Sequence, residues 1–218
     1  MTLVESGDVA RRVAEVVARL RATAPPVELV AVTKAFPVDA VAAAATAGCT
    51  RIGENYADEV LEKSPAARTR GLRVHFIGRL QSNKVRKMAD LVDVWESVDR
   101  VALVNEIAKR QPEGEILIQV NATGESDKGG CAPGEVEALI GAANAASLRV
   151  DGLMTVGPTS GDASGTAAAF RAVRRLTDDL DLPTCSMGMS HDLQIALDEG
   201  TTRVRLGTAL FGARPRPS

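Results

Sequence analysis

Short runs of β-branched and apolar residues alternate with longer helical patterns along almost the whole chain. Strands that alternate with helices form parallel sheets covered by helices, and eight strands are enough to close a barrel. The sequence therefore predicts an α/β fold, a (β/α)8 TIM barrel that forms one domain over residues 1–218. The eight predicted strands cover residues 29–33, 51–54, 73–77, 92–97, 115–121, 149–155, 184–187 and 203–206. The helices predicted between them cover residues 38–47, 55–63, 82–91, 100–110, 134–146, 163–180 and 193–199.

The first predicted strand argues against an open, doubly wound sheet. It runs into Thr33-Lys34-Ala35, without the GxGxxG fingerprint that such a sheet normally carries at this turn. Apolar residues before this strand recur at helical spacing, which predicts an extra N-terminal helix packed against the barrel. The residues on the apolar face of this N-terminal helix are Val9, Val13, Val16, Val17 and Leu20. At the other end of the chain, residues 213–218 are expected to form a loose tail.

Composition narrows the class of protein. A net charge of −2 argues against a nucleic-acid or anionic-membrane surface, so the basic stretches at 68–73 and 84–87 are interpreted as solvated faces. No run of about 18 apolar residues predicts a membrane span, and residues 1–20 lack the apolar core of a signal peptide. Three scattered cysteines and two histidines indicate neither a disulfide framework nor a zinc site, which fits a reducing cytoplasm. Because aromatic residues make up only 3%, Ala, Val and Leu are expected to fill the interior.

Polar residues end several of the predicted strands, and in a barrel of this type the active residues gather at those ends. Lys34 follows the first strand, where partial burial would free its amine to act as a nucleophile. The alternative is a lysine at the rim that extends its ammonium group into water. The other strand-end candidates are Asn55, Ile77, Gly78, Ser97, Asn121, Met154, Thr155, residues 186–190 and residues 205–208.

The loops after the seventh and eighth strands often bind phosphate in such barrels. Ser190 and Thr208 offer hydroxyl groups there, and Gly207 would let backbone amides approach closely. The alternative is that Ser190 only caps the next helix and Gly207 only serves the turn. Arg205 is expected near the barrel mouth, where a ligand acceptor would satisfy its charge; an ordinary salt bridge is the alternative.

The motifs that carry these residues resemble those of the pyridoxal phosphate homeostasis proteins, small barrels similar to the N-terminal domain of alanine racemase. The resemblance runs from Leu29 to Gly212 in family order. The matching stretches are LVAVTKAFP, RIGENYADE, HFIGRLQSNKVRKMAD, QVNATGESDKGG, DGLMTVGP, SMGMSHDLQIALDEG and TTRVRLGTALFG.

The resemblance implies that the chain holds pyridoxal 5′-phosphate (PLP) as a Schiff base on Lys34. It also implies that Ser190, Gly207 and Thr208 hold the phosphate, that Arg205 faces the pyridine nitrogen and that Asn55 contacts the ring. An arginine cannot readily lose its proton, so the ring nitrogen would stay unprotonated and be a poorer electron sink.

The function implied is PLP carriage or buffering without turnover, which contributes to PLP and to amino-acid and keto-acid homeostasis. Apo forms of PLP-dependent enzymes are possible recipients, and the chain is expected to be a monomer or weak dimer. A weak racemase or lyase is the second hypothesis, although the eight βα units leave no room for the second domain that supplies a tyrosine in racemases. A barrel enzyme that acts on a phosphorylated sugar or acid is the third.

Two positions depart from, or extend, the family pattern. Phe36 stands where many relatives carry a second lysine, which puts a relay of cofactor between neighbouring lysines in doubt. Lys128 matches a lysine of the family motif and is a candidate for loading or release, although a solvated loop lysine is the favoured interpretation. Tyr56, the one tyrosine, is interpreted as a packing residue at a helix start, and His191 as an exposed residue without an identified partner.

Overall fold

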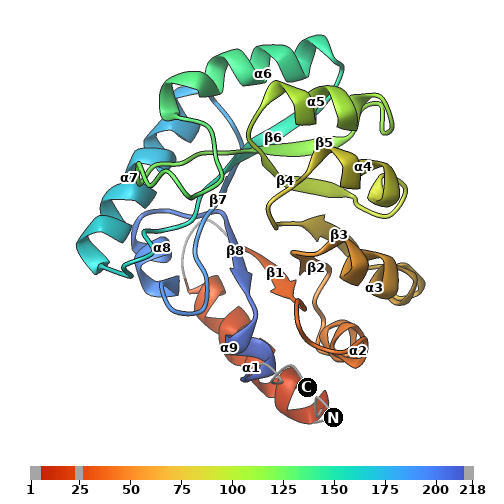
Figure 1. The fold of residues 1–218 in the computed structure, drawn as a ribbon. Coiled ribbons are helices and arrows are strands. Elements are labelled where there is room, and N and C mark those ends of the chain that lie inside the picture. Colours follow the sequence, from red (N-terminus) through yellow and green to blue (C-terminus); the bar gives the residue numbers. More distant parts are fainter. Residues whose placement is uncertain (1–5, 23–26, 214–218) are drawn as a thin grey trace.

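Eight parallel strands close into a barrel in the computed structural model, which describes residues 6–22 and 27–213 (Figure 1). Each strand pairs with the next in the sequence, and β8 returns to pair with β1 with Val30 opposite Arg205. This order confirms the predicted (β/α)8 barrel. The strands are β1 (Glu28–Val32), β2 (Arg51–Glu54), β3 (Arg73–Phe76), β4 (Val94–Val98), β5 (Glu115–Gln119), β6 (Arg149–Met154), β7 (Thr184–Ser186) and β8 (Arg203–Leu206).

Helices surround the barrel at nearly all the predicted positions. One difference is α3, which continues past the predicted end at Lys63 and contains Pro65. Because Lys63 and Ala67 continue the buried face while Pro65 lies on the exposed face, burial outweighs the hydrogen bond that proline removes. The helices are α1 (Ser6–Arg21), α2 (Asp39–Thr46), α3 (Ala57–Thr69), α4 (Ser82–Met88), α5 (Val101–Ala108), the 3-10 turn η1 (Pro133–Glu135), α6 (Val136–Ala145), α7 (Ala163–Asp179), α8 (Leu193–Asp198) and α9 (Thr208–Phe211).

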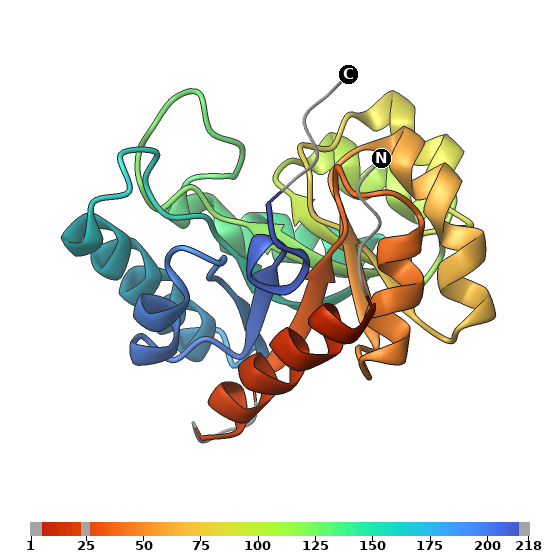
Figure 2. The same ribbon diagram turned by 90° about the horizontal axis from the view of Figure 1, so that it is seen from below.

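The predicted N-terminal helix is confirmed as α1, which lies along the outside of the barrel against α2 and α9 (Figure 2). Val9, Val13 and Leu20 on its predicted apolar face are buried, and Val16 and Val17 are partly buried. Of the predicted loose tail, only Ala213 lies within the described residues. None of the described helices is both long enough and apolar enough to cross a membrane.

The core has two chemically different layers. Apolar residues fill the space between the strands and the helices, as expected from the abundance of Ala, Val and Leu. Inside the barrel, Val94, Leu117 and Met154 form a separate small apolar cluster. The expectation that Ala, Val and Leu fill the interior is therefore confirmed for the layer outside the strands, whereas the barrel interior also contains buried polar side chains. They include His75, Glu96, Ser186, Arg203 and Arg205.

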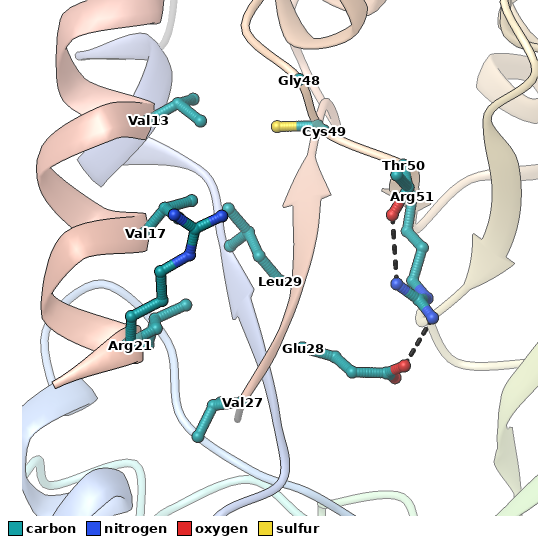
Figure 3. Close-up of a pocket in the computed structure, with 11 residues that line it drawn as sticks. Val13, Val17, Arg21, Val27, Glu28, Leu29, Gly48, Cys49, Thr50 and Arg51 are labelled. Atoms are coloured by element: carbon teal, nitrogen blue, oxygen red, sulfur yellow. Dashed lines mark hydrogen bonds and ion pairs between the residues drawn. The ribbon is translucent and has the colours of Figure 1, made fainter. Parts of the chain in front are cut away.

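The amino-terminal ends of the strands carry ion pairs. Glu28 at the start of β1 bonds the side chains of Arg51 and Arg203, and Glu115 pairs with Arg73 and Arg149. Figure 3 shows the Glu28–Arg51 pair beside a 230 Å³ hollow between α1 and the starts of β1 and β2. Ion pairs therefore connect the strands at this end of the barrel. The strand-end candidate residues lie on the loops at the opposite end.

Candidate functional site

A cavity of 330 Å³ opens at the carboxyl ends of the strands and contains all six residues that the sequence singled out. They reach it from the ends of four strands, β1, β2, β7 and β8, which the closed barrel brings together. A cavity of this size lies within the range of small-molecule sites. Its lining residues are Val32, Lys34, Asn55, Ile77, Val156, Met189, Ser190, His191, Arg205, Gly207 and Thr208.

Lys34 sits in a tight turn between β1 and α2. The turn is closed by a hydrogen bond from the Phe36 amide to the Thr33 carbonyl, at 3.1 Å, and Ala35 adopts a left-handed φ of 60°. A left-handed alanine is strained, so other contacts must hold this backbone in place. The Lys34 side chain is half-buried and lines the cavity, which disagrees with a lysine that simply extends into solvent.

Two charged side chains of α3 hold the backbone on either side of Lys34. The Ala35 amide donates to both carboxylate oxygens of Glu59, at 3.0 and 3.1 Å. On the other side, the ammonium group of Lys63 donates to the Thr33 carbonyl at 2.7 Å, and its side chain is only 1% exposed. The turn that presents Lys34 is therefore fixed by α3 before any ligand is considered.

Lys63 also lies between two carboxyl groups with different pKa values. Its ammonium is 2.8 Å from Glu59 and 3.1 Å from Glu54, and the Thr33 hydroxyl also bonds Glu54. Burial, followed by the hydrogen bond with Glu59, raises the pKa of Glu54 to about 8. Burial alone would raise the pKa of Glu59 too, but its hydrogen bonds to Glu54, Lys63 and Ala35 lower it. Near neutral pH the cluster holds one ammonium, one carboxylate and a Glu54 side chain that largely keeps its proton.

The loops after β7 and β8 meet at the other side of the cavity. The Ser190 hydroxyl accepts a hydrogen bond from the Ala209 amide at 3.1 Å and so joins the β7 loop to α9. Ser190 does not cap α8, whose N-cap residue is Asp192, so the simple capping interpretation of Ser190 is wrong. Gly207 and Thr208 begin α9, where the first amides of a helix have no partner within the helix.

The φ of Gly207, −117°, does not itself demand glycine. A Cβ atom there would lie 3.1 Å from the Val32 carbonyl oxygen, a tight contact that a larger residue would have to relieve by a small shift of β8 or β1. The two sides of the cavity are also joined by an aromatic contact, since Phe36 packs against Phe211 with ring centroids 5.2 Å apart. Phe36, which stands at the second-lysine position of many relatives, is buried and ties the Lys34 turn to α9.

Arg205 lies on β8 and is only 4% exposed. Its guanidinium donates to the Ser186 hydroxyl at 2.7 Å and to the Thr155 carbonyl at 2.8 Å. Burial lowers the pKa of Arg205, and the nearby charge of Glu96 opposes that effect. No described carboxylate lies within 4 Å of the guanidinium, which disagrees with the salt-bridge interpretation of this residue. The cation faces the cavity with neutral partners behind it.

Asn55 supplies the most specific sign of a ligand. Its Oδ1 atom is buried and makes no hydrogen bond, although its side chain lines the cavity. A buried acceptor without a partner costs about 1–3 kcal/mol, so a ligand donor would recover that free energy. An amine, a cation, an unmatched acceptor and a group of phosphate-binding donors therefore surround one space, and this set fits PLP.

Other predicted residues fall outside the cavity. Ser97, inside β4, and Asn121, two residues after the end of β5, do not line it. Lys128 is not a solvated loop lysine: its ammonium donates to the Gly157 carbonyl at 2.5 Å and pairs with Glu125. It holds the loop after β6, which reaches the cavity through Val156. The packing interpretation of Tyr56 is wrong, because this residue begins α3 as expected but is 60% exposed.

Sequence reasoning missed residues of two kinds. His191, for which the sequence suggested no partner, lines the cavity beside the predicted Met189, and its Nε2 atom lies 3.4 Å from Asp192. His75 and Glu96 lie deeper inside the barrel and make a 2.6 Å hydrogen bond. Strand periodicity did not single out this buried pair, because the same strands carry other polar residues, Arg73 and Ser97.

The family described as alanine racemase, N-terminal domain, matches residues 10–215. The chain is 41% identical to the pyridoxal phosphate homeostasis protein of Pseudomonas aeruginosa, over 94% of this chain and 96% of that protein. The corresponding protein of Escherichia coli K12 is 34% identical, with 95% and 97% covered.

Solved structures agree. PipY of Synechococcus elongatus, in a structure with PLP bound, superposes with a TM-score of 0.82 at 32% identity and covers 94% of this chain and 100% of that one. Alanine racemase from Corynebacterium glutamicum is 19% identical and shares the fold, with a TM-score of 0.76 over 97% of this chain and 62% of that one. The chain therefore belongs to the family of pyridoxal phosphate homeostasis proteins and carries the alanine racemase N-terminal domain.

Proposed function

We propose that this protein binds PLP in the cavity and carries or buffers it as a Schiff base on Lys34, without catalytic turnover. The observation that supports this most strongly is that Lys34, Arg205 and the Ser190–Thr208 side of the cavity face one space of 330 Å³. The PLP-bound structure of PipY, at 32% identity, supports the same ligand. When bound, PLP would supply an aldehyde that an amine can capture and a ring that can accept electrons.

Lys34 would form the covalent link. Its amine nitrogen would form a bond to the aldehyde carbon, and the aldehyde oxygen would leave as water. The turn fixed by Glu59 and Lys63 holds the amine toward the cavity in advance, which lowers the entropy cost of this reaction.

The loops after β7 and β8 would hold the phosphate. Because the Ser190 hydroxyl already accepts from the Ala209 amide, its own hydrogen is left to donate to an anion. The amides of Gly207 and Thr208 and the Thr208 hydroxyl are the other donors on this side. Asn55 would bond a substituent of the ring through its unmatched Oδ1 atom.

Arg205 would face the ring nitrogen and keep it unprotonated, since a guanidinium gives up its proton only with difficulty. A neutral ring stabilises a substrate carbanion poorly, which favours a carrier over a racemase. Among the described cavity residues there is no tyrosine that could serve as a second acid or base, and Tyr56 is largely exposed.

A spectroscopic titration with PLP tests this function. The wild-type protein should turn yellow with one PLP per chain, and Lys34→Ala should lose the imine absorption. Lys109→Ala, which changes an exposed lysine at the C-cap of α5, should behave as wild type. Arg205→Glu should change the absorption spectrum by reversing the charge at the ring. Wild-type protein that stays colourless in excess PLP would refute the proposal.

A second assay separates a carrier from an enzyme. Loaded protein mixed with an apo PLP-dependent enzyme should restore that enzyme's activity, and incubation with amino acids should give no sustained turnover. Turnover that depends on Lys34 would show instead that the protein is an enzyme.

A further inference from the structure

Four side chains form a chain of hydrogen bonds across the inside of the barrel, from the floor of the cavity to its centre. Arg205 donates to the Ser186 hydroxyl at 2.7 Å, and that hydroxyl donates to Glu96 at 2.7 Å. The other carboxylate oxygen of Glu96 is 2.6 Å from Nδ1 of His75. The strands that carry Glu96 and Ser186, β4 and β7, are not neighbours in the sheet, so this connection crosses the interior (Figure 1).

The donor and acceptor roles along this chain follow from chemistry. A guanidinium can only donate hydrogen bonds, and a carboxylate can only accept them. The Ser186 hydroxyl must therefore accept from Arg205 and donate its single hydrogen to Glu96. For the same reason, Nδ1 of His75 carries a hydrogen. The hydrogen bonds therefore converge on Glu96 from both ends of the chain, from Arg205 through Ser186 on the cavity side and from His75 on the other.

Glu96 is a fixed negative charge although it is completely buried. Burial alone would raise the pKa of Glu96, but the hydrogen bond and charge of His75, with the charges of Arg203 and Arg205, hold it at about 2. Such a carboxylate is retained only where the surrounding cations and donors compensate its desolvation.

The position of the other buried arginine shows which cation Glu96 serves. Arg203 is 3.8 Å from Glu96 but already pairs with Glu28 at 2.7 Å and with Asp151 at 3.2 Å. Arg205 has no described carboxylate within 4 Å and reaches Glu96 only through Ser186. The other titratable groups whose charges act on Arg205 are Asp192, Cys185 and Arg203.

We propose that Glu96 is the positioning residue for Arg205: it orients the guanidinium through Ser186 and supplies the countercharge that keeps this cation at the floor of the PLP site. His75 holds Glu96 in turn. The Thr155 carbonyl fixes the second guanidinium nitrogen, so the plane of the group is set at two points and its remaining N–H groups are left to the cavity. This inference rests on the proposed function, because it assigns Glu96 and Ser186 to the same PLP site.

Glu96→Gln and Ser186→Ala test the proposal. The first keeps the shape and one of the two accepting oxygen atoms but removes the charge, and the second keeps the charge but removes the bridge. Glu115→Gln is the matched control, because Glu115 is a buried carboxylate with arginine partners at the other end of the barrel. All variants would be titrated with PLP at several pH values, and thermal unfolding would be measured in parallel.

Glu96→Gln should lower the pH midpoint of the PLP absorption change by about one unit, since loss of a nearby negative charge disfavours a protonated imine. Ser186→Ala should weaken PLP binding about tenfold, and the double variant should bind no worse than the weaker single variant. Glu115→Gln should lower the unfolding temperature but move neither the midpoint nor the affinity.

The inference is overturned if both site variants match Glu115→Gln in affinity and absorption. Should Glu96→Gln fail to fold, wild-type affinity and absorption in Ser186→Ala overturn it alone. Wild-type protein that takes up no PLP would instead refute the proposed function.

Discussion

The unfolding free energy of the wild-type barrel should fall as pH rises, and replacing Glu54 with glutamine should largely abolish this pH dependence. Glu54 is fully buried at the end of β2, and its pKa is raised from 4.5 to about 8, first by burial and then by its hydrogen bond with Glu59. A folded-state pKa above the unfolded value means that the folded protein holds the extra proton. The stabilisation is complete below about pH 4.5 and is lost as pH rises through about 8.

The size of the effect follows from that shift. At about 1.36 kcal/mol per pKa unit, a rise from 4.5 to about 8 corresponds to at most ~5 kcal/mol. Part of the effect lies below pH 5, and Lys63 and Glu59 readjust when Glu54 ionises, so the expected loss of unfolding free energy between pH 5 and 8.5 is about 2 to 4 kcal/mol. Glutamine imitates the protonated acid at every pH, so the Glu54→Gln variant should lose less than about 1 kcal/mol over the same range.

Urea unfolding at pH 5 and pH 8.5 measures this difference, with the fluorescence of the single, buried Trp95 as the probe. Glu62→Gln, an exposed position on the same helix, is the control and should follow the wild type. The reasoning fails if Glu54→Gln and wild type lose the same free energy between the two pH values. The other carboxyl groups whose pKa values are shifted are lowered, so they affect stability below this range.

Two further substitutions test how the site is supported. Lys63→Met removes the ammonium from the buried oxygen atoms of Glu54 and Thr33 and from a partly buried one of Glu59, and should lower the unfolding free energy by about 3 kcal/mol. Lys87→Met, at an exposed position, should change it by less than about 0.5 kcal/mol, and equal effects in urea unfolding would contradict the account. Gly78→Ala would place a Cβ atom 2.1 Å from the Asn55 carbonyl oxygen, so it should displace Asn55 and weaken PLP binding at least about tenfold. The control is Gly141→Ala, in an open helical position, which should stabilise the protein by about 0.5–1 kcal/mol and leave PLP titrations unchanged. Unaltered PLP affinity in Gly78→Ala would refute a role for the close approach of Gly78 to Asn55.

The barrel was predictable because its pattern is local. Each short β-branched run is bounded by turn or helix signals, and the strand at Arg51–Glu54 appears residue for residue as predicted. The grouping of the six candidate residues was also predictable, since the carboxyl ends of all strands in a barrel face the same opening. The chemical role of each residue stays a prediction until a ligand is bound.

Side-chain contacts between distant segments were not predictable. Lys63 reads as an ordinary helical lysine in the sequence, yet it is buried because α3 places it under the turn of Lys34. Glu96 and Ser186 are 90 positions apart and meet only because the barrel closes. Tertiary packing also sets the length of α3. The helix continues through Pro65 because residues on both sides of the proline, Lys63 and Ala67, are buried against the barrel.

The central claim is that Lys34 is the residue that binds PLP covalently. Borohydride reduction of the PLP-treated protein, followed by mass measurement of its peptides, tests this directly because reduction fixes the imine on the lysine that formed it. The account predicts one pyridoxyl phosphate group per chain, attached to the peptide that contains Lys34. A modification on Lys63, Lys128 or a surface lysine, with Lys34 unmodified, would contradict it.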